Sequence, residues 1–510
     1  MTIRSLLLAA ALASGLLLGG CATNPVTGRS DVVTMSAAQE VEIGRRMHPQ
    51  ILQEYGRYAD EAVQTYVSEI GQRIAAKSHR PDLQYTFTVL DSEEVNAFAL
   101  PGGYVGVHLG LIALTTSRDE LASVLAHELT HITQRHIARG IVNSKRQSLL
   151  AVAGMIIGII AAGRANSADA ANAVIAGSQA AQLQGQLNFS RDMEREADRV
   201  GFAVLAGAGF ARGGMASMFD KLDSSSRLND SGAYPYLRSH PLNAERIGDA
   251  RARAGDAIGS GARGDLEHAA AQARARVLMD IRTDALLRWQ AEDAERAGAG
   301  RNERFASALQ SALASTLLRD YARADAALGR AAAIARESGE ARAGRAVGLL
   351  AAQSLVARGD GAAALRTLER FTAEGSRPVL LLTAQAAALL PAGDPAVKRS
   401  ADELQTWVAL RPQDALAWLL LSPLWTRLAQ PLRALRAEAE ARIAIADLGG
   451  AIERLRAGQR LARESPGKGA ADHIDASVID ARLREVEAQR RRELAADRAE
   501  RGERTDRSDR

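Results

Sequence analysis

The chain of 510 residues is long enough for two domains with substantial cores, and its 4% of aromatic residues with abundant Ala, Leu and Arg favour helix almost throughout. The sequence pI of about 9.3 comes with a net charge of only +4, and Arg is interspersed with Glu and Asp, which argues against nucleic acid as a partner. The only cysteine is Cys21, so an internal disulfide is excluded.

The amino terminus predicts the compartment. A basic residue precedes an apolar run over 6–18 that is too short to span a bilayer, and the Leu-Gly-Gly before Cys21 resembles the lipobox of bacterial lipoproteins. We therefore expect a signal peptide over 1–20, lipidation of Cys21 and a tether over 21–35, with two or more acyl chains giving stable anchoring. Ala22 after the cysteine resembles sorting to the outer membrane, facing the periplasm. The alternative is a plain secretory signal.

Two strands are expected before the first long polar helix. Alternating residues predict a strand over 84–90, and Gly102-Gly103 allow a turn into a second strand over 104–107. An exposed edge there could pair with an extended polypeptide through main-chain hydrogen bonds, giving affinity with little sequence selectivity. The alternative is a small sheet that only supports the following helix. For His108 we expect no role beyond that of a satisfied or an exposed histidine.

The most informative motif is HELTH at 127–131, on a predicted helix. Ser117 followed by Glu120 is typical of a capping box, and the apolar residues between them and the motif recur with the helical period. Residues i and i+4 share a helix face, so the two imidazoles can bind one zinc ion, while Glu128 can reach a zinc-bound water. The alternative is a chance pattern on a charged helix.

An apolar run over 149–163 follows the motif, and Ala/Asn/Ser/Gly-rich sequence continues to about residue 186. A buried helical hairpin is one interpretation, because the run is short for a transmembrane helix. The other is a flap over the active-site cleft that touches substrate or membrane, because small residues resist specific packing. The sequence favours neither.

A second polar helix is predicted after residue 190, with Glu194 and Asp198 again four residues apart. One carboxylate of this pair could complete the zinc site, and the other could accept the free N–H of a ligating histidine. The alternative is a solvated acidic face, which we expect for Glu196. Gly201 suits close approach of another helix, as expected if the two helices enclose the metal.

The C-terminal half is expected to be a separate helical domain. Glycines over 255–264 mark the boundary, so we predict a zinc metallopeptidase domain over 36–258 and a repeat domain over 265–468. Units that begin near Asp320, Asp360 and Pro412 resemble tetratricopeptide repeats, although the spacing is imperfect. Such solenoids usually bind a partner protein on a concave surface. The charged tail over 469–510 is predicted to be a solvated helix that passes into disorder.

Four segments together resemble the HtpX/BepA-like family of zinc metallopeptidases. They are HELTH at 127–131, EREADRVG at 194–201, NAFALPGGYV at 96–105, and Ser-His-Pro at 239–241 with Arg-Ile at 246–247. The resemblance covers about residues 36 to 256. It implies a mainly α fold: an α+β metallopeptidase domain with a small β-sheet, followed by the α-helical, tetratricopeptide-like solenoid.

The resemblance also implies roles for individual residues. His127, His131 and Glu194 would bind one zinc ion per chain, Glu128 would be the general base, and Asp198 matches the acidic residue behind the ligands.

Two more segments receive roles from the same likeness. His240 could occupy the open zinc position as a latch, or stabilise the oxyanion once substrate displaces it; the alternative is a loop histidine that only packs. Asn96, Ala97 and Phe98 would bind substrate at the sheet edge.

These features predict a zinc metalloendopeptidase of the bacterial periplasm, anchored to the outer membrane, that hydrolyses misfolded or stalled envelope proteins. Its partners would be unfolded or misassembled polypeptides and, through the repeats, the outer-membrane assembly machinery. The alternative is a chaperone or assembly scaffold whose metal site is structural or little used. An intact Glu128 favours the enzyme, because a structural zinc site needs no base.

Overall fold

The computed structural model describes residues 21–23, 30–32, 35–56, 58, 60–140, 191–228, 234–257, 265–292, 299–464 and 470–508. The predicted signal peptide, the apolar run over 149–163 and most of the glycine-rich boundary lie outside these residues. Among the residues that are described, no helix is both long enough and apolar enough to cross a membrane. The chain divides into two compact units, one of residues 1–318 and 326–346 and the other of 319–325 and 347–510.

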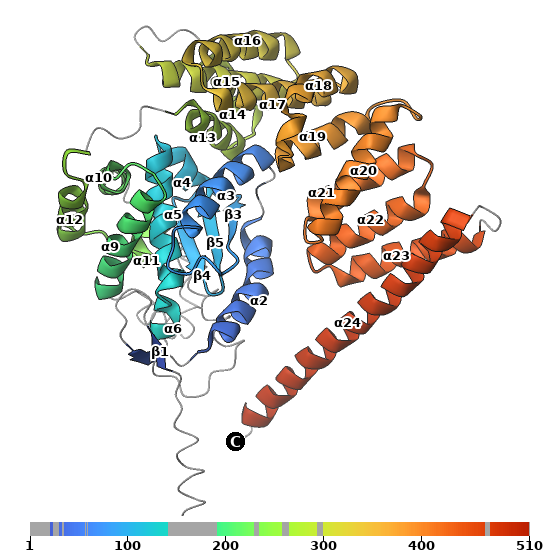
Figure 1. The fold of residues 1–510 in the computed structure, drawn as a ribbon, viewed down its shortest axis with the longest axis horizontal. Helices are drawn as coiled ribbons and strands as arrows, with labels where there is room; N and C mark the ends of the chain where they lie inside the picture. Colours follow the sequence, from blue (N-terminus) through green and yellow to red (C-terminus); the bar gives the residue numbers. More distant parts are fainter. Residues whose placement is uncertain are drawn as a thin grey trace, which may run out of the picture. The chain divides into compact units, whose positions relative to one another are not determined.

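A three-stranded sheet lies within the helices of the first unit (Figure 1). Strand order is β3-β5-β4, with β5 parallel to β3 and antiparallel to β4. The bounds are β3 (Thr86–Leu90), β4 (Ala97–Leu100) and β5 (Tyr104–His108), so both predicted strands are confirmed with small shifts at their ends. Gly102 and Gly103 have φ of +80° and +100°, which explains the two glycines in the β4–β5 turn. A separate antiparallel pair, β1 (Cys21–Thr23) and β2 (Ser30–Val32), was not predicted.

Helices surround this sheet. Those of the first unit are α2 (Ala37–Tyr55), α3 (Glu61–Ala75), α4 (Leu109–Leu114), α5 (Arg118–Thr133), α6 (His136–Gly140), α9 (Arg191–Gly207), α10 (Gly213–Leu228), α11 (Pro235–Ser239), α12 (Ala244–Ala254), α13 (Leu266–Met279), α14 (Thr283–Ala291) and α15 (Arg301–Leu317). α5 packs on β4, β5, α3, α9 and α10, so it lies at the centre of the unit. Every residue of α5 from Asp119 to Thr133 is buried, which fixes the metal motif in a rigid core.

α13 is anchored in the same core by polar contacts. Its Arg274 forms a buried ion pair with Asp60, the residue that caps α3. His268 Nδ1 lies 2.9 Å from the hydroxyl of Tyr66, and His268 Nε2 lies 3.2 Å from the carbonyl of Thr115. Both ring nitrogens of the buried His268 therefore have partners when the ring is neutral.

His108 is fully buried, which excludes the exposed alternative. Its ring meets Tyr55 edge-on at 4.8 Å between centroids and Phe98 at 5.9 Å. The histidine therefore packs between α2 and the sheet, on the face of β5 that carries Phe98 of the neighbouring strand.

Two helices are shared between the units, α16 (Tyr321–Ser338) and α17 (Ala341–Ala357). The remaining helices of the second unit are α18 (Gly361–Leu368), the 3₁₀ helix η3 (Glu369–Glu374), α19 (Arg377–Ala388), α20 (Pro395–Leu410), α21 (Ala415–Arg427), α22 (Pro431–Ala444), α23 (Leu448–Glu464) and α24 (Ala470–Ser508). Consecutive helices from α18 to α24 pack against each other, as in a helical solenoid. Aspartates cap two of these helices at their N-termini: the side chains of Asp360 and Asp414 accept the third backbone N–H of α18 and α21.

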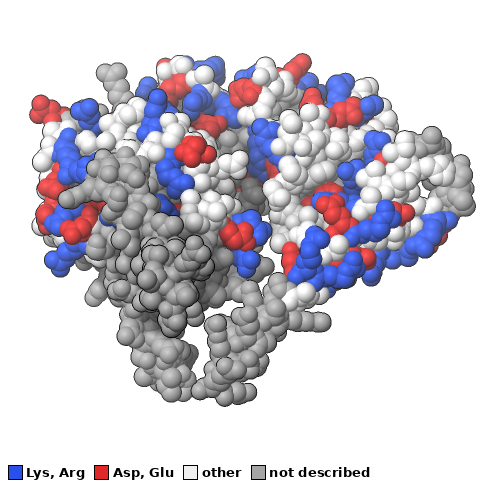
Figure 2. Space-filling model, turned by 60° about the horizontal axis from the view of Figure 1, so that its bottom comes forward, with Lys and Arg blue, Asp and Glu red and all other residues white. Residues whose placement is uncertain are grey.

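The predicted fold class is confirmed: the chain is mainly helical, with one small three-stranded sheet and a helical C-terminal region. The tetratricopeptide-like nature of the repeats and the domain boundaries stay predictions. The C-terminal tail, expected as helix and disorder, is helical from Ala470 to Ser508. Figure 2 shows basic and acidic side chains interspersed over the described surface of one face, the pattern expected for solvated helices.

Candidate metal centre

The metal helix α5 begins as the sequence predicts, with one difference. Ser117 caps the helix, its Oγ accepting the N–H of Glu120 at 3.2 Å. The Glu120 carboxylate, however, accepts the N–H of Thr116 at 2.7 Å rather than that of Ser117, and it also binds Lys221 and Ser217 of α10. The predicted capping box is therefore only half formed, because Glu120 instead joins α5 to α10.

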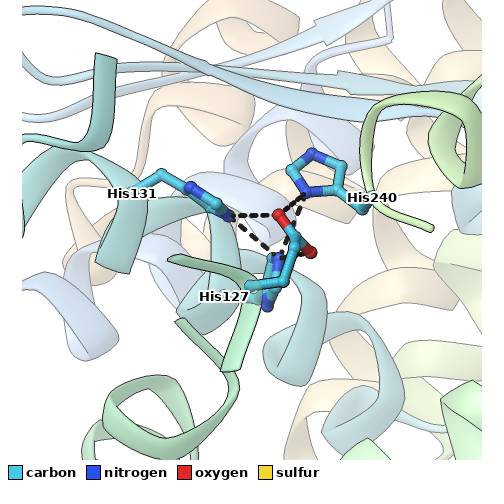
Figure 3. A group of neighbouring side chains, drawn as sticks. His127, His131 and His240 are labelled. Atoms are coloured by element: carbon cyan, nitrogen blue, oxygen red, sulfur yellow. Dashed lines mark hydrogen bonds and ion pairs between the residues drawn. The ribbon is translucent and has the colours of Figure 1, made fainter. Parts of the chain in front are cut away.

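Four donor atoms from three parts of the chain converge beside α5. The rings of His127, His131 and His240 point toward one another (Figure 3), and Glu194 completes a buried cluster whose donor atoms lie within 4.8 Å of one another. His127 Nε2 lies 3.0 Å from His131 Nε2 and 3.3 Å from His240 Nδ1. Glu194 Oε1 lies 3.0 Å from His240 Nδ1 and 3.4 Å from His131 Nε2. The predicted ligands His127, His131 and Glu194 therefore do lie together.

These distances fit a tetrahedral zinc ion. Zinc–ligand bonds of about 2.0–2.1 Å put the corners of a tetrahedron roughly 3.3 Å apart, close to the observed separations. His127 Nδ1 lies 3.0 Å from Asp198 Oδ1, so a neutral His127 donates there and directs the lone pair of Nε2 into the cluster. When the histidines are neutral, their lone pairs and the Glu194 carboxylate can hold a cation between them, and zinc takes this donor set.

The charges around the cluster keep the carboxylates ionised. Burial would raise the pKa of Glu194, but His240 and His127 outweigh it and hold that pKa well below its ordinary value. Burial likewise lowers the pKa of His127, yet its hydrogen bonds to Asp198 and Glu194 raise it to about 10. In the metal-free protein, protonated histidines therefore supply the positive charge that keeps these carboxylates ionised, and a bound cation can take over that role.

Asp198 lies behind the cluster, where the sequence placed it. Its two oxygens accept Nε and Nη2 of Arg246 at 2.7 and 2.8 Å, and Arg246 Nη1 lies 2.9 Å from Glu194 Oε2. Burial raises the pKa of Asp198, but the Arg246 hydrogen bonds lower it overall. Arg246 thus pairs with both Glu194 and Asp198, a role that the sequence alone did not reveal.

Glu128, the predicted general base, lies beside the cluster. It is fully buried, and its Oε1 lies 3.4 Å from His240 Nε2. Burial raises its pKa, opposed by the nearby His240 and His127. A buried carboxylate with raised pKa beside a cation site suits proton transfer.

His240 directly follows α11, where its N–H bonds the carbonyl of Tyr236 at 2.9 Å. The Tyr236 ring stacks on it, with 4.8 Å between ring centroids. Tyr236 N–H in turn bonds the carbonyl of Val95, just before β4. His240 therefore packs against Tyr236 and also contacts Glu194 and Glu128. Its position is not that of a loop histidine that only packs.

The expected solvated position of Glu196 is wrong. Its side chain is 14% exposed, and Oε2 lies 3.2 Å from His136 Nε2 and 2.9 Å from Arg139 Nη1. His136 was missed in the sequence because it follows His131 by five residues, which is not a same-face spacing on one helix. A cluster of three histidines within ten residues was the available signal.

The predicted substrate residues lie at the sheet edge, since β4 is the outer strand beside β5. The His108 N–H bonds the carbonyl of Asn96, so Asn96 pairs with β5. Hydrogen-bonded and non-hydrogen-bonded residues alternate along an antiparallel strand, so the main chain of Phe98 also bonds to β5. The main-chain groups of Ala97 and Ala99 point away from β5, to the free edge of β4. The Oδ1 atom of Asn96 is buried without a hydrogen bond.

Part of the chain is similar to known proteins. Residues 61–254 match the sequence profile described as peptidase family M48. A Vibrio cholerae serotype O1 protein named as a beta-barrel assembly-enhancing protease is 42% identical over 198 residues, 38% of this chain and 40% of that protein. The beta-barrel assembly-enhancing protease of Escherichia coli is 33% identical over 232 residues, 46% of this chain and 47% of the relative.

A mitochondrial metalloendopeptidase of Schizosaccharomyces pombe, OMA1, is 28% identical over 237 residues, 44% of this chain and 63% of that protein. The chain thus spans about half the length of the curated bacterial relatives that it matches. The predicted resemblance to HtpX/BepA-like metallopeptidases is confirmed, whereas the roles of individual residues stay predictions.

Proposed function

We propose that the domain of peptidase family M48 in this chain, residues 61–254, is a zinc-dependent endopeptidase that cuts unfolded or misassembled polypeptides. The observation that carries the proposal is the convergence of His127, His131, Glu194 and His240 around one point, with the buried carboxylate of Glu128 beside it. A structural metal site has no use for such a base.

The protein groups divide the work of hydrolysis between them. His127, His131 and Glu194 would hold a zinc ion, which would supply the Lewis acidity that lowers the pKa of water and polarises the scissile carbonyl. Glu128 accepts a proton from the attacking water and delivers it to the leaving amine, which its raised pKa favours. Asp198 holds the ring of His127 by its Nδ1–H, and Arg246 fixes that carboxylate.

His240 acts as a latch in this proposal. A catalytic zinc keeps one coordination position open, yet here a fourth protein donor lies 3.0 Å from Glu194 Oε1 and 3.3 Å from His127 Nε2. Peptide binding must therefore displace the His240 ring, which can then hydrogen-bond the developing oxyanion. A His240→Ala variant should cleave faster than the wild type if the latch limits activity. Unchanged activity would remove the latch, whereas lower activity would favour the oxyanion role.

Substrate binds along β4 in this account. The main-chain groups of Ala97 and Ala99 face away from β5, so an extended peptide can add a strand there. Main-chain pairing gives low sequence selectivity, which suits a protease for unfolded chains. The amide side chain of Asn96, with its unbonded oxygen, is then available to hold the peptide in register.

We place the enzyme in the periplasm, anchored to the outer membrane through Cys21. Support comes from the lipobox and from relatives whose names refer to beta-barrel assembly. The helical repeats would bind substrate or the outer-membrane assembly machinery. Palmitate labelling that is lost in a Cys21→Ser variant would test the anchor.

The second candidate is a chaperone or scaffold with a structural zinc ion. It is favoured by the same fourth ligand, because four protein donors are typical of closed, structural sites. The test is cleavage of casein by the zinc-loaded wild type, by Glu128→Gln and by His240→Ala. Cleavage by the first or third protein but not by Glu128→Gln supports the protease. If none of the three proteins cleaves casein, His240→Ala included, but all three suppress aggregation, the result would support the scaffold.

A further inference from the structure

The chain turns sharply at the end of the metal helix. α5 ends at Thr133, and Arg135 has φ of +55°, in the left-handed region that non-glycine residues rarely adopt. Arg135 Nε donates to Glu40 Oε2 at 2.8 Å, which ties this turn to α2. α6 begins at the next residue, so His136 folds back onto the end of α5 instead of continuing along its surface.

The turn places His136 between a metal ligand and a carboxylate. His136 Nδ1 lies 2.9 Å from His131 Nδ1, and the ring planes cross at 78° with centroids 4.8 Å apart. On the far side of the ring, His136 Nε2 lies 3.2 Å from Glu196 Oε2. The ring is fully buried, and Arg139 Nη1 also donates to Glu196 Oε2 at 2.9 Å.

The donor and the acceptor of each hydrogen bond in this chain of contacts can be assigned. An ionised carboxylate only accepts, so His136 Nε2 carries the hydrogen that points to Glu196. The Nδ1 atom of a neutral His136 is then a lone pair, and the hydrogen between the two rings belongs to His131 Nδ1. The remaining nitrogen of His131, Nε2, therefore directs its lone pair toward His127 and Glu194.

We propose that His136 and Glu196 are positioning residues that hold the ring of His131 in the orientation and tautomer that bind zinc. The inference rests on the zinc site of the proposed function and adds a second support to it. Asp198 holds His127 directly, while Glu196 holds His131 through His136. Glu194, Glu196 and Asp198 of α9 thus serve the metal and its two histidine ligands.

The zinc affinity of variants measures this role. Loss of a group that orients a metal ligand typically weakens metal binding by about 10–100-fold, and we expect that range for His136→Leu. Glu196→Leu, which removes the acceptor for His136 Nε2, should weaken binding by roughly tenfold, the lower end of the same range. His136→Gln should retain most of the affinity, because its amide can accept from His131 and donate to Glu196.

Asp192→Asn is the matched control. It removes a carboxylate from the same helix α9, but its side chain is 85% exposed and pairs with Arg195. Its zinc affinity should equal that of the wild type. Melting temperatures of the metal-free proteins report whether a variant has lost structure instead of a metal-specific contact.

The experiment is competition for zinc between a chelator and the full-length chain, with the absorption spectrum of bound Co²⁺ as a second readout. Weaker binding and an altered spectrum in His136→Leu and Glu196→Leu, with recovery in His136→Gln, support the inference. Wild-type affinity in Glu196→Leu overturns it, even if His136→Leu fails to fold. Absence of zinc binding by the wild type would refute the proposed function as well, whereas unchanged variants refute the inference alone.

Discussion

Replacement of Arg246 by Met should destabilise the metal-free protein strongly. Arg246 is buried, and its guanidinium contacts both Asp198 and Glu194, at 2.7 to 2.9 Å. Met fills similar space without a charge, so the two buried carboxylates lose the positive charge of the Arg246 guanidinium. Breaking a buried pair by removing one partner costs about 3–5 kcal/mol. At about 1.4 kcal/mol per factor of ten, local opening of α9 should become roughly 100- to 4,000-fold more frequent.

Arg251→Met, on the same helix α12, is the control for this prediction. Arg251 pairs with Asp220 at 2.7 Å, but both side chains are substantially exposed, at 55% and 38%. Exposed pairs contribute about 0–1 kcal/mol, so this variant should hardly change the protein. Arg246→Met combined with Asp198→Asn should recover part of the loss, because the double variant buries one charge fewer.

Hydrogen exchange followed by mass spectrometry is the suitable assay, because peptides from α9 and α12 report local opening without assuming that a chain of several domains unfolds in one step. Chelator is present, so that zinc does not replace the missing positive charge. If Arg246→Met and Arg251→Met change the exchange of α9 equally, the reasoning about buried charge is refuted.

Three further predictions address the pH response, the helix contact and the sheet edge. Burial lowers the pKa of His268 from 6.5 to about 4 in the folded protein. The contribution of the neutral His268 ring to the free energy of unfolding is therefore fully present above pH 6.5 and is lost as the pH falls toward 4. Across that window the wild type should lose ~3 kcal/mol more stability than His268→Gln in urea titrations, and parallel pH profiles would contradict this. A Cβ on Gly201 would lie 3.1 Å from the carbonyl oxygen of Ala126 and 3.3 Å from His127 Cα, whereas Gly207 of the same helix has open space. Gly201→Val should therefore cost about 1–3 kcal/mol and weaken zinc binding, and Gly207→Val should do neither in the same melting and competition assays. Ala99→Pro removes a main-chain donor from the free edge of β4, so casein cleavage should fall while zinc content stays at the wild-type level; unchanged cleavage would exclude strand addition there.

Local periodicity made the metal helix predictable. HELTH puts two imidazoles on one face of any helix, and Glu194 with Asp198 repeats the same spacing, so the donor types and their faces follow from the helix alone. Gly201 correctly indicated close packing of the second helix, since its missing side chain lets α9 approach α5.

Contacts that depend on tertiary structure were not predictable in the same way. The role of His136 requires the left-handed turn at Arg135, which no periodic pattern indicates. Arg246 is one of many arginines in the chain, and its pairing with Asp198 spans 48 residues. Glu196 was expected on a solvated helix face, yet His136 of α6 covers its side chain.

The zinc content of the purified full-length chain tests the central claim most directly. Elemental analysis should give one zinc ion per chain for the wild type and none for a His127→Ala/Glu194→Ala double variant that remains folded. A wild type without zinc, or a double variant that retains it, would contradict the account.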